Sequence, residues 1–296
     1  MDQIKIAAAQ YPISQFSSLG DWQKHIHRWI QAAVAEDSKL LIFPEYGSIE
    51  LTSLMSQAER EDLSFLAKGL EQYLDDFKKT FRSQAVQNNI YIIAPSIPVF
   101  DSGRVVNRAF VFSPEGKIDF QDKQYMTRFE DEEWKIQAGQ PVIKIFQTKY
   151  FNFSISICFD IEFPGPSQIA SKHGAQILVA PSCTETLKGL NRVHIGARAR
   201  ALENQTYVVV AQTILDSKWS PAVDVNTGQA AFYAPPDLGF TDDGILTQGL
   251  INSEGWVYML LDLGLISKVR QQGAVLNHHH NQKTTYSEWS YQIIPM

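Results

Sequence analysis

Strand-like and helix-like segments alternate along most of this sequence. Ile4–Ala9 and Ile90–Ala94 are short apolar runs typical of buried strands, whereas Asp21–Ala35 places its apolar side chains at helical spacing. This alternation predicts an α/β fold, because a strand returns parallel to its neighbour only through a long crossover such as a helix. No repeat or linker-like stretch divides the chain, so we expect one domain over residues 1–270. The tail at 271–296 is expected to pack on that domain or on a partner subunit.

Turn signals refine this prediction. Ser113–Gly116 and Asn252–Gly255 each separate two strand-like runs, so we expect two β-hairpins and a mixed sheet or pair of sheets. The helical stretch 57–88 is expected to break near Gly69. Segment 219–243 is rich in Pro, Asp and Gly and has little periodicity, which predicts a long loop that borders a pocket.

The composition narrows the range of partners and compartments. Hydrophobic residues make up 44% of the 296-residue chain, charged residues 20%, and the net charge is −6. This mild acidity argues against nucleic acid or an anionic membrane as the main partner. Two cysteines make no disulfide framework, no signal peptide is recognisable, and no apolar run reaches the roughly 18 residues of a membrane span. We therefore expect a cytoplasmic protein.

Three polar residues stand where strand-like runs end. Glu45 follows a short apolar run that stops at Pro44, Lys123 ends the second arm of the first expected hairpin, and Cys158 closes an alternating Phe- and Ile-rich run. In α/β proteins, ligands bind in the loops just beyond strand ends. A carboxylate that accepts a proton, an ammonium that stabilises an oxyanion and lowers the thiol pKa, and a thiol nucleophile would form a coherent site there.

Short motifs around these residues resemble the nitrilase superfamily of carbon–nitrogen hydrolases. They are Phe43–Glu45, Asp122–Lys123 and Ile157–Pro164, in the order of the family's Glu–Lys–Cys triad, followed by Arg198–Asn204, which is similar to the family's helix after the nucleophile. The resemblance covers nearly the whole chain. It implies an αββα sandwich, in which two mixed sheets pack face to face beneath outer helices, and association through those helices to at least a homodimer.

The resemblance also implies roles for these residues. Cys158 is the nucleophile, Glu45 the general base, and Lys123 the oxyanion stabiliser together with the backbone N–H of Phe159. A second glutamate after the lysine positions substrate or water; we assign it to Glu130, with Glu132 as the alternative. No metal or organic cofactor is implied.

The motif around the nucleophile favours an amide substrate. Cys158-Phe159-Asp160 is similar to amide- and carbamoyl-cleaving members, whereas nitrile-cleaving members carry Cys-Trp-Glu. We therefore expect an amidase for a small linear amide, with nitrile or N-carbamoyl hydrolysis as alternatives. The predicted substrate-binding residues are Tyr46, Phe159, Phe163, Cys183, Thr184 and Trp219.

Several other interpretations are weaker. A Cys–His hydrolase would need His173 or His194 as base, but neither is next to a strand end. Cys183 lacks the motif that surrounds the first thiol, and the consecutive His278–His280 cannot converge on one metal ion, so we expect a solvated tail there. A catalytically silent scaffold would show the loss of a triad residue, and none is lost. A dinucleotide enzyme would show a G-x-G-x-x-G motif after the first strand, and none is present.

Overall fold

The computed structural model describes residues 3–63, 65–284, 290 and 292–293. The strands are β1 (Gln3–Pro12), β2 (Leu40–Ile42), β3 (Tyr91–Ile93), β4 (Ile97–Asp101), β5 (Arg104–Phe112), β6 (Ile118–Asp122), β7 (Phe146–Gln147), β8 (Asn152–Ile155), β9 (Ile177–Ser182), β10 (Tyr207–Ile214), β11 (Ala231–Tyr233), β12 (Ile245–Gln248) and β13 (Gly255–Asp262). The helices are α1 (Leu19–Ala35), α2 (Gln57–Glu61), α3 (Leu66–Glu71), α4 (Leu74–Asn88), α5 (Arg128–Glu132), α6 (Pro164–Lys172), α7 (Leu187–Asn204), α8 (Leu263–Gln272) and α9 (Asn277–Lys283), with 3-10 helices η1 (Gly47–Leu54) and η2 (Cys158–Glu162).

The strands form one hydrogen-bonded network. We call β4-β5-β3-β2 with β6 its first wing and β10-β9-β8-β7 its second wing. Its order is β4-β5-β3-β2-β1-β10-β9-β8-β7, and β6, β13, β11 and β12 attach to β5, β1, β10 and β11, respectively. Strands β3, β2, β1, β10, β9 and β8 are parallel, whereas β4, β5, β6 and β13 join by antiparallel pairing, so the sheet is mixed as predicted.

The two wings pack on each other through one apolar core. Ile42 and Val111 of the β2–β5 wing lie in the same buried cluster as Phe153 and Val179 of the β8–β9 wing. Successive side chains of a strand point to opposite faces of the sheet, so the face of the first wing that points away from this core must be buried by other elements.

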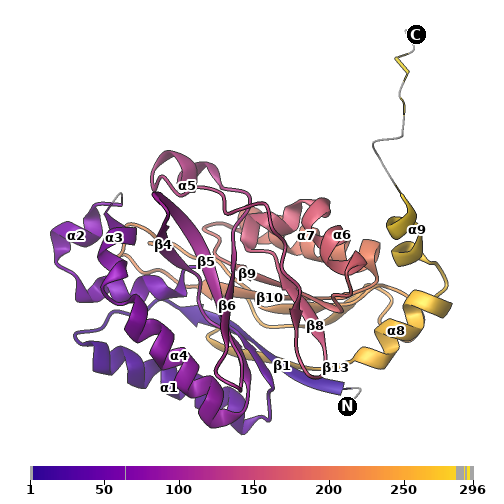
Figure 1. Cartoon of the computed structure of the whole chain (residues 1–296), viewed down its shortest axis with the longest axis horizontal. Coiled ribbons are helices and arrows are strands. Elements are labelled where there is room, and N and C mark those ends of the chain that lie inside the picture. The colour runs from indigo at the N-terminus through magenta and orange to yellow at the C-terminus, as the bar shows by residue number, and fades with distance from the viewer. Residues whose placement is uncertain (1–2, 64, 285–289, 291, 294–296) are drawn as a thin grey trace.

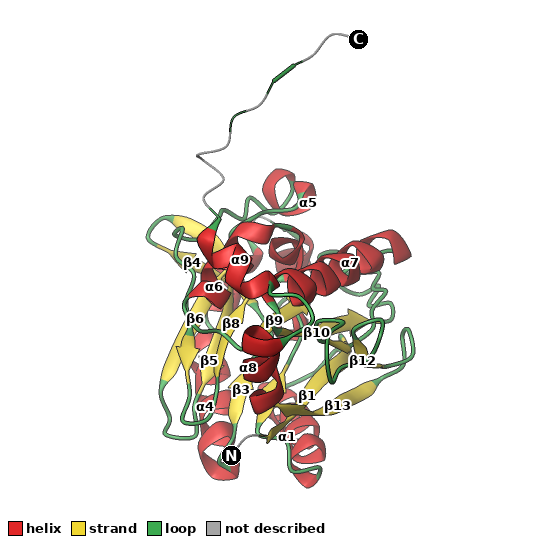
Figure 2. Ribbon diagram, turned by 90° about the vertical axis from the view of Figure 1, so that its right-hand side faces the viewer, coloured by secondary structure: helices red, strands yellow, loops and turns green. Residues whose placement is uncertain are grey.

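Helices cover the outer face of each wing. The cluster that holds Leu41 and Phe43 of the first wing also holds α1 and α4 residues such as Trp22 and Phe81. On the second wing, α7 packs against β10, and α6 lies beside α7. Figure 1 shows α1 and α4 on one side of the strands and α6 and α7 on the other, and Figure 2 shows the same arrangement from the side. The predicted α/β sandwich is confirmed.

One of the two expected hairpins is present, and several other sequence expectations about strands and helices are not met. The first hairpin is confirmed, because β5 and β6 pair around Ser113–Gly116. The second is wrong: β12 pairs with β11, and β13 pairs with β1 instead. The helical stretch 57–88 consists of α2, α3 and α4, but the break expected near Gly69 is wrong, because Gly69 lies inside α3 and the chain leaves the helix on either side of α3. The expected loop at 219–243 contains the short strand β11.

The C-terminal segment packs on the outer helices as far as the described residues extend. Asn281 of α9 donates to the carbonyl of Glu203 at 3.0 Å and accepts from Gln168 at its own carbonyl at 3.1 Å. His278–His280 lie in α9, where His278 is half-buried and His279 and His280 are exposed, so these histidines are solvated as expected but belong to a helix. Contact with a partner subunit stays a prediction. Among the described helices, none is both long and apolar enough to cross a membrane.

Candidate active site

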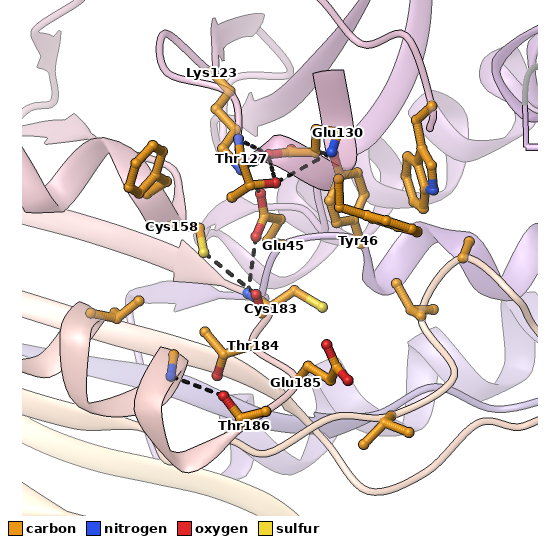
Figure 3. A pocket seen from close by; sticks show the side chains of 18 of the residues that line it. Glu45, Tyr46, Lys123, Thr127, Glu130, Cys158, Cys183, Thr184, Glu185 and Thr186 are labelled. Atoms are coloured by element: carbon orange, nitrogen blue, oxygen red, sulfur yellow. Dashed lines mark hydrogen bonds and ion pairs between the residues drawn. The ribbon is translucent and has the colours of Figure 1, made fainter. Parts of the chain in front are cut away.

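The three strand-end residues line one cavity of about 520 Å³. Glu45 lies three residues beyond the end of β2, Lys123 follows β6 directly, and Cys158 lies three residues beyond β8. Figure 3 shows their side chains converging from these separate segments. The sequence-predicted trio is therefore brought together, and Glu130 joins it in the same wall.

A buried ion cluster forms one side of this cavity. The Nζ atom of Lys123 lies 2.8 Å from Oε1 of Glu45, and 2.8 Å and 2.6 Å from Oε1 and Oε2 of Glu130. All three side chains are almost completely shielded from solvent. One ammonium thus neutralises two carboxylates only in part, and the cluster keeps a formal charge of −1 when all three groups are ionised.

Tyr46 and Thr127 together donate three hydrogen bonds to the carboxylate of Glu130. The Tyr46 hydroxyl donates to its Oε1 at 2.5 Å, and Thr127, the N-cap of α5, donates its N–H and hydroxyl to Oε2 at 2.9 Å and 2.8 Å. This capping box fixes the first turn of the helix. Glu132 is exposed instead and pairs with Arg128 at 2.6 Å, so Glu130 is the glutamate that meets the lysine.

Glu45 also accepts hydrogen bonds from two residues that are far away in the sequence. The side-chain amide of Asn107 donates to its Oε1 at 2.9 Å, and the backbone N–H of Cys183 donates to its Oε2 at 3.0 Å. Asn107 was missed by the sequence analysis. Its sequence signal was weak, an amide inside the strand-like run of β5, and its complete burial is seen only in the structure.

Cys158 sits in a strained turn rather than at the end of a strand. β8 stops at Ile155, and Cys158 opens η2 with φ 48°, in the left-handed region that disfavours side chains with a Cβ. The Asp160 carboxylate secures the turn, because it accepts from the N–H of Ile157 at 3.2 Å and of Tyr125 at 2.8 Å. Asp160 thereby ties the nucleophile turn to the segment that follows Lys123.

Burial dominates the protonation of this site. Burial and then the charge of Glu45 raise the pKa of the Cys158 thiol well above its ordinary value. The charge of Lys123 lowers this pKa, as expected, but burial and Glu45 outweigh it. Burial raises the pKa of Glu45 to about 7 against the opposing charge of Lys123. Burial alone would raise the pKa of Glu130, but Lys123 holds it below its ordinary value. The two carboxylates raise the pKa of Lys123 well above its usual range, although burial opposes them.

Four of the six predicted substrate-binding residues line the cavity: Tyr46, Phe159, Cys183 and Thr184. Phe163 and Trp219 do not. The Phe163 ring stacks on Tyr125 at 4.0 Å between centroids, and Trp219 packs against the α1 and α4 core. The loop of Trp219 still borders the cavity through Pro221–Val225. Glu185, which follows Thr184 in the same expected turn, also lines the cavity. Wall residues that the sequence analysis missed are Thr127, Phe129, Trp134, Glu162, Thr186, Gly189, Arg192 and Val193.

The residues proposed for a Cys–His hydrolase lie elsewhere. His194 is buried between Tyr233 and Gln212, with its Nε2 3.0 Å from the Gln212 side-chain oxygen. His173 is at the end of α6 and contacts the carbonyl of Ile169 at 2.9 Å. Within the described part of the chain, no histidine lines the cavity.

Comparison with known proteins identifies relatives over most of the chain. A model of the family described as carbon-nitrogen hydrolase matches residues 5–249. The probable hydrolase YhcX of Bacillus subtilis (strain 168) is 32% identical over 283 residues, which are 96% of this chain and 54% of that protein. This chain therefore spans about half the length of that relative. The omega-amidase NIT2 of Danio rerio is 25% identical over 293 residues, 95% of this chain and 96% of the relative.

A solved structure supports the fold. Nit3 of Saccharomyces cerevisiae, a member of branch 10 of the nitrilase superfamily, matches with a TM-score of 0.72 at 22% identity. The match covers 91% of this chain and 94% of Nit3. At this identity, the likeness concerns the arrangement of helices and strands.

Proposed function

Because this chain belongs to the carbon-nitrogen hydrolase family of the nitrilase superfamily, we propose that it hydrolyses the carbon–nitrogen bond of a small linear amide through Cys158. The main support is the convergence of Glu45, Lys123 and Cys158 on one cavity. A base, a cation and a thiol are the groups that acyl transfer from an amide requires.

The first half of the reaction forms a thioester. Glu45 takes the thiol proton as the Cys158 sulfur attacks the amide carbon, and the carbonyl oxygen becomes an oxyanion. Lys123 and the N–H of Phe159 stabilise that oxyanion, a contribution that in such sites is worth ~10²–10³ in rate per donor. The C–N bond then breaks, and protonated Glu45 gives its proton to the departing ammonia or amine.

The second half regenerates the protein. Glu45 removes a proton from water, which attacks the thioester carbon and forms a second oxyanion at the same donors. The C–S bond breaks, the carboxylic acid leaves, and the thiolate of Cys158 recovers its proton from Glu45. One amide and one water are consumed for one acid and one ammonia or amine. Glu130 holds Lys123 in place through both halves.

Amide cleavage is favoured over the alternatives by the segment that carries the thiol. Cys158-Phe159-Asp160 is similar to amide- and carbamoyl-cleaving members, and the relative NIT2 is named an omega-amidase. Nitrile and N-carbamoyl hydrolysis on the same residues remain alternatives. A silent scaffold is disfavoured because all members of the Glu–Lys–Cys set are present and line the cavity.

The test is an ammonia-release screen over linear amides, ω-amides, N-carbamoyl compounds and nitriles, run beside Cys158→Ala. We expect turnover of linear amides that the alanine variant loses, and an acyl adduct on Cys158 in intact-mass spectra after a rapid acid quench. Activity that persists in Cys158→Ala would overturn the mechanism. Turnover confined to nitriles would overturn the substrate class but keep the nucleophile.

We also propose that the protein forms a homodimer through its outer helices and acts in the cytoplasm. Leu187, Ile195 and Leu202 lie along α7 with 56%, 67% and 42% of their surface exposed, and Ile169 of neighbouring α6 is 49% exposed. Such an apolar stripe is typical of a surface that a second copy covers. Free cysteines fit a reducing compartment.

The dimer can be tested with one charged substitution. Ile195→Glu should reduce the mass measured by light scattering from dimer to monomer. Leu250→Glu changes a more exposed residue, at 77%, outside these helices and serves as the matched control. An unchanged dimer in Ile195→Glu would place the interface elsewhere.

A further inference from the structure

Asn107 occupies an unusual position for an amide side chain. It lies near the middle of β5, is completely buried, and is flanked in the strand by Val106 and Arg108. Its backbone carbonyl accepts the N–H of Lys123 at 2.9 Å. The residue therefore fixes where the lysine leaves the sheet, before its own side chain is considered.

The side chain of Asn107 connects the two carboxylates of the site. Its Nδ2 atom lies 2.9 Å from Oε1 of Glu45 and 3.4 Å from Oε1 of Glu130. In the opposite orientation of the amide, Oδ1 would face both carboxylates and be repelled, so electrostatics selects the orientation in which the N–H groups donate. Asn107 thus contacts Glu45, Glu130 and Lys123.

The acceptor end of the same amide reveals what the residue does. The Oδ1 atom of Asn107 is buried and has no hydrogen-bond partner among the described residues. An amide that served only to stabilise the core would be expected to satisfy both ends, because an unpaired buried acceptor is destabilising. The donor end alone is used, and it is used on the charged groups of the active site.

The contacts on Glu45 leave one position for the thiol proton. Lys123 and Asn107 both donate to Oε1, whereas the N–H of Cys183 donates to Oε2, and the Cys158 thiol also interacts with this carboxylate. A carboxylate oxygen has two lone-pair sites, so Oε2 keeps one that is free to act as a base. A neutral donor on Oε1 stabilises the ionised carboxylate without adding a second positive charge.

We propose that Asn107 is a positioning residue for the general base: its amide bridges Glu45 and Glu130, donates to Oε1 of Glu45 and leaves Oε2 available to the proton of Cys158. This inference rests on the proposed function of Glu45. Asn107 does not line the cavity, so it acts on the base and not on the substrate.

Two variants with different chemistry test the proposal. Asn107→Leu removes the donor with similar volume, and Asn107→Asp keeps the shape but adds a third carboxylate. In both, the acid-limb midpoint of kcat/KM against pH should move upward, by about one pH unit for the loss of one hydrogen bond to a charged group. At neutral pH, kcat should fall about 10- to 100-fold, whereas KM should stay within about twofold because no substrate contact is lost.

A second readout does not require turnover. The rate of Cys158 alkylation by iodoacetamide, followed by intact mass from pH 5 to 9, should show the same upward shift in both variants. Asn204→Leu is the matched control, because it removes a buried amide at the end of α7, away from the cavity, and should leave both midpoints unchanged.

The outcomes separate the two hypotheses. A folded Asn107 variant with unchanged midpoints, or with its loss confined to KM, would overturn the positioning role. Should Asn107→Leu fail to fold, Asn107→Asp decides by the same criterion. A protein that hydrolyses no amide but shows shifted alkylation in the variants would reject the proposed substrate and retain the role of Asn107.

Discussion

The thiol sulfur of Cys158 lies 3.5 Å from the carbonyl oxygen of Cys183, and the backbone N–H of Cys183 donates to Oε2 of Glu45 at 3.0 Å. One residue therefore binds the proposed nucleophile through its carbonyl and the proposed base through its N–H. The carbonyl of Cys183 thereby accepts from the Cys158 thiol, and the same thiol also interacts with the carboxylate of Glu45. Cys183 does this with backbone atoms that any residue possesses.

The two cysteines should therefore respond differently to mutation. Cys183→Ala loses a contact between its sulfur and the Asn226 side-chain oxygen at 3.2 Å but keeps both backbone hydrogen bonds, so activity should fall less than about tenfold. Cys158→Ala removes the nucleophile and should abolish turnover. Ammonia release and melting temperature measured on both variants check this. Equal loss of activity in the two variants, both folded, would make Cys183 a rival nucleophile.

The activity should depend on pH through Glu45. Its pKa is raised to about 7 by burial, and it must be ionised to accept the thiol proton, so kcat/KM should increase with pH and level off above about 7. The pKa of Lys123 is far above this range, so the ammonium stays charged throughout. Glu45→Gln should lower kcat by ~10²–10⁴ and remove the pH dependence of what remains. A flat profile between pH 5 and 8 in the unmutated protein would rule out this base.

Lys123 should stabilise the fold as well as the reaction. Lys123→Met leaves Glu45 and Glu130 buried without their cation, which typically costs ~3–5 kcal/mol. The pKa values of the two carboxylates in the folded variant then rise. The decrease in the free energy of unfolding should therefore be largest at pH 8 and smaller at pH 5, where the carboxylates take up protons. Urea unfolding at the two pH values measures this.

An exposed ion pair is the control for that experiment. Lys144 lies 2.6 Å from Asp119, but its side chain is 31% exposed, so Lys144→Met should cost less than about 1 kcal/mol at either pH. Equal losses in the two lysine variants would contradict a special role for the buried cluster.

Charges around the cavity should affect substrate choice. The guanidinium of Arg192 is held by Glu162 at 3.0 Å, whereas no ion pair involves Glu185 or Asp224 among the described residues. An amide with a negative far end should therefore be a poorer substrate than a neutral amide of the same length. Glu185→Gln and Asp224→Asn should each improve its kcat/KM by about two- to fivefold, an effect that salt weakens. An equal increase in kcat/KM for the neutral amide would contradict an electrostatic cause.

The convergence of the proposed catalytic residues Glu45, Lys123 and Cys158 was predictable because its signal is local. Each residue follows a strand-like run, and strand ends in an α/β protein meet at one edge. Asn107 was not predictable in this way. Its partners come from the segments after β2 and β6 and from α5, and only the tertiary arrangement brings them within hydrogen-bond distance of β5.

The failed hairpin and the misplaced aromatic residues have a related explanation. Asn252–Gly255 is a good turn sequence, but β13 pairs over eight residues with β1, from the other end of the chain, and this longer pairing determines its place in the sheet. Phe163 follows the nucleophile as expected, yet its ring is turned toward Tyr125. A local pattern fixes where a segment begins, whereas the available partners decide which way it faces.

Glu50 gives a final prediction, for stability against pH. The side chain is completely buried, accepts from the Tyr11 hydroxyl at 2.7 Å and from the N–H of Ser14 at 2.9 Å, and burial raises its pKa from 4.5 to about 8. A carboxyl with a raised folded pKa stabilises the fold fully below its unfolded pKa, and this stability is lost as pH rises through the folded value. The free energy of unfolding should therefore decrease between pH 5 and 8, with a contribution from Glu50 of up to about 1.4 kcal/mol per pH unit.

Glu50→Gln isolates this contribution. Glutamine keeps the shape and an acceptor for Tyr11 but has no titratable proton, so its unfolding free energy should decrease less steeply from pH 5 to 8 than that of the unmutated protein. Glu45 and Asp160, whose pKa values burial raises to about 7, titrate in both proteins and cancel in the difference. Chemical denaturation at pH 5, 6.5 and 8 gives the two slopes. Parallel slopes would mean that Glu50 is already ionised in the folded protein at pH 5.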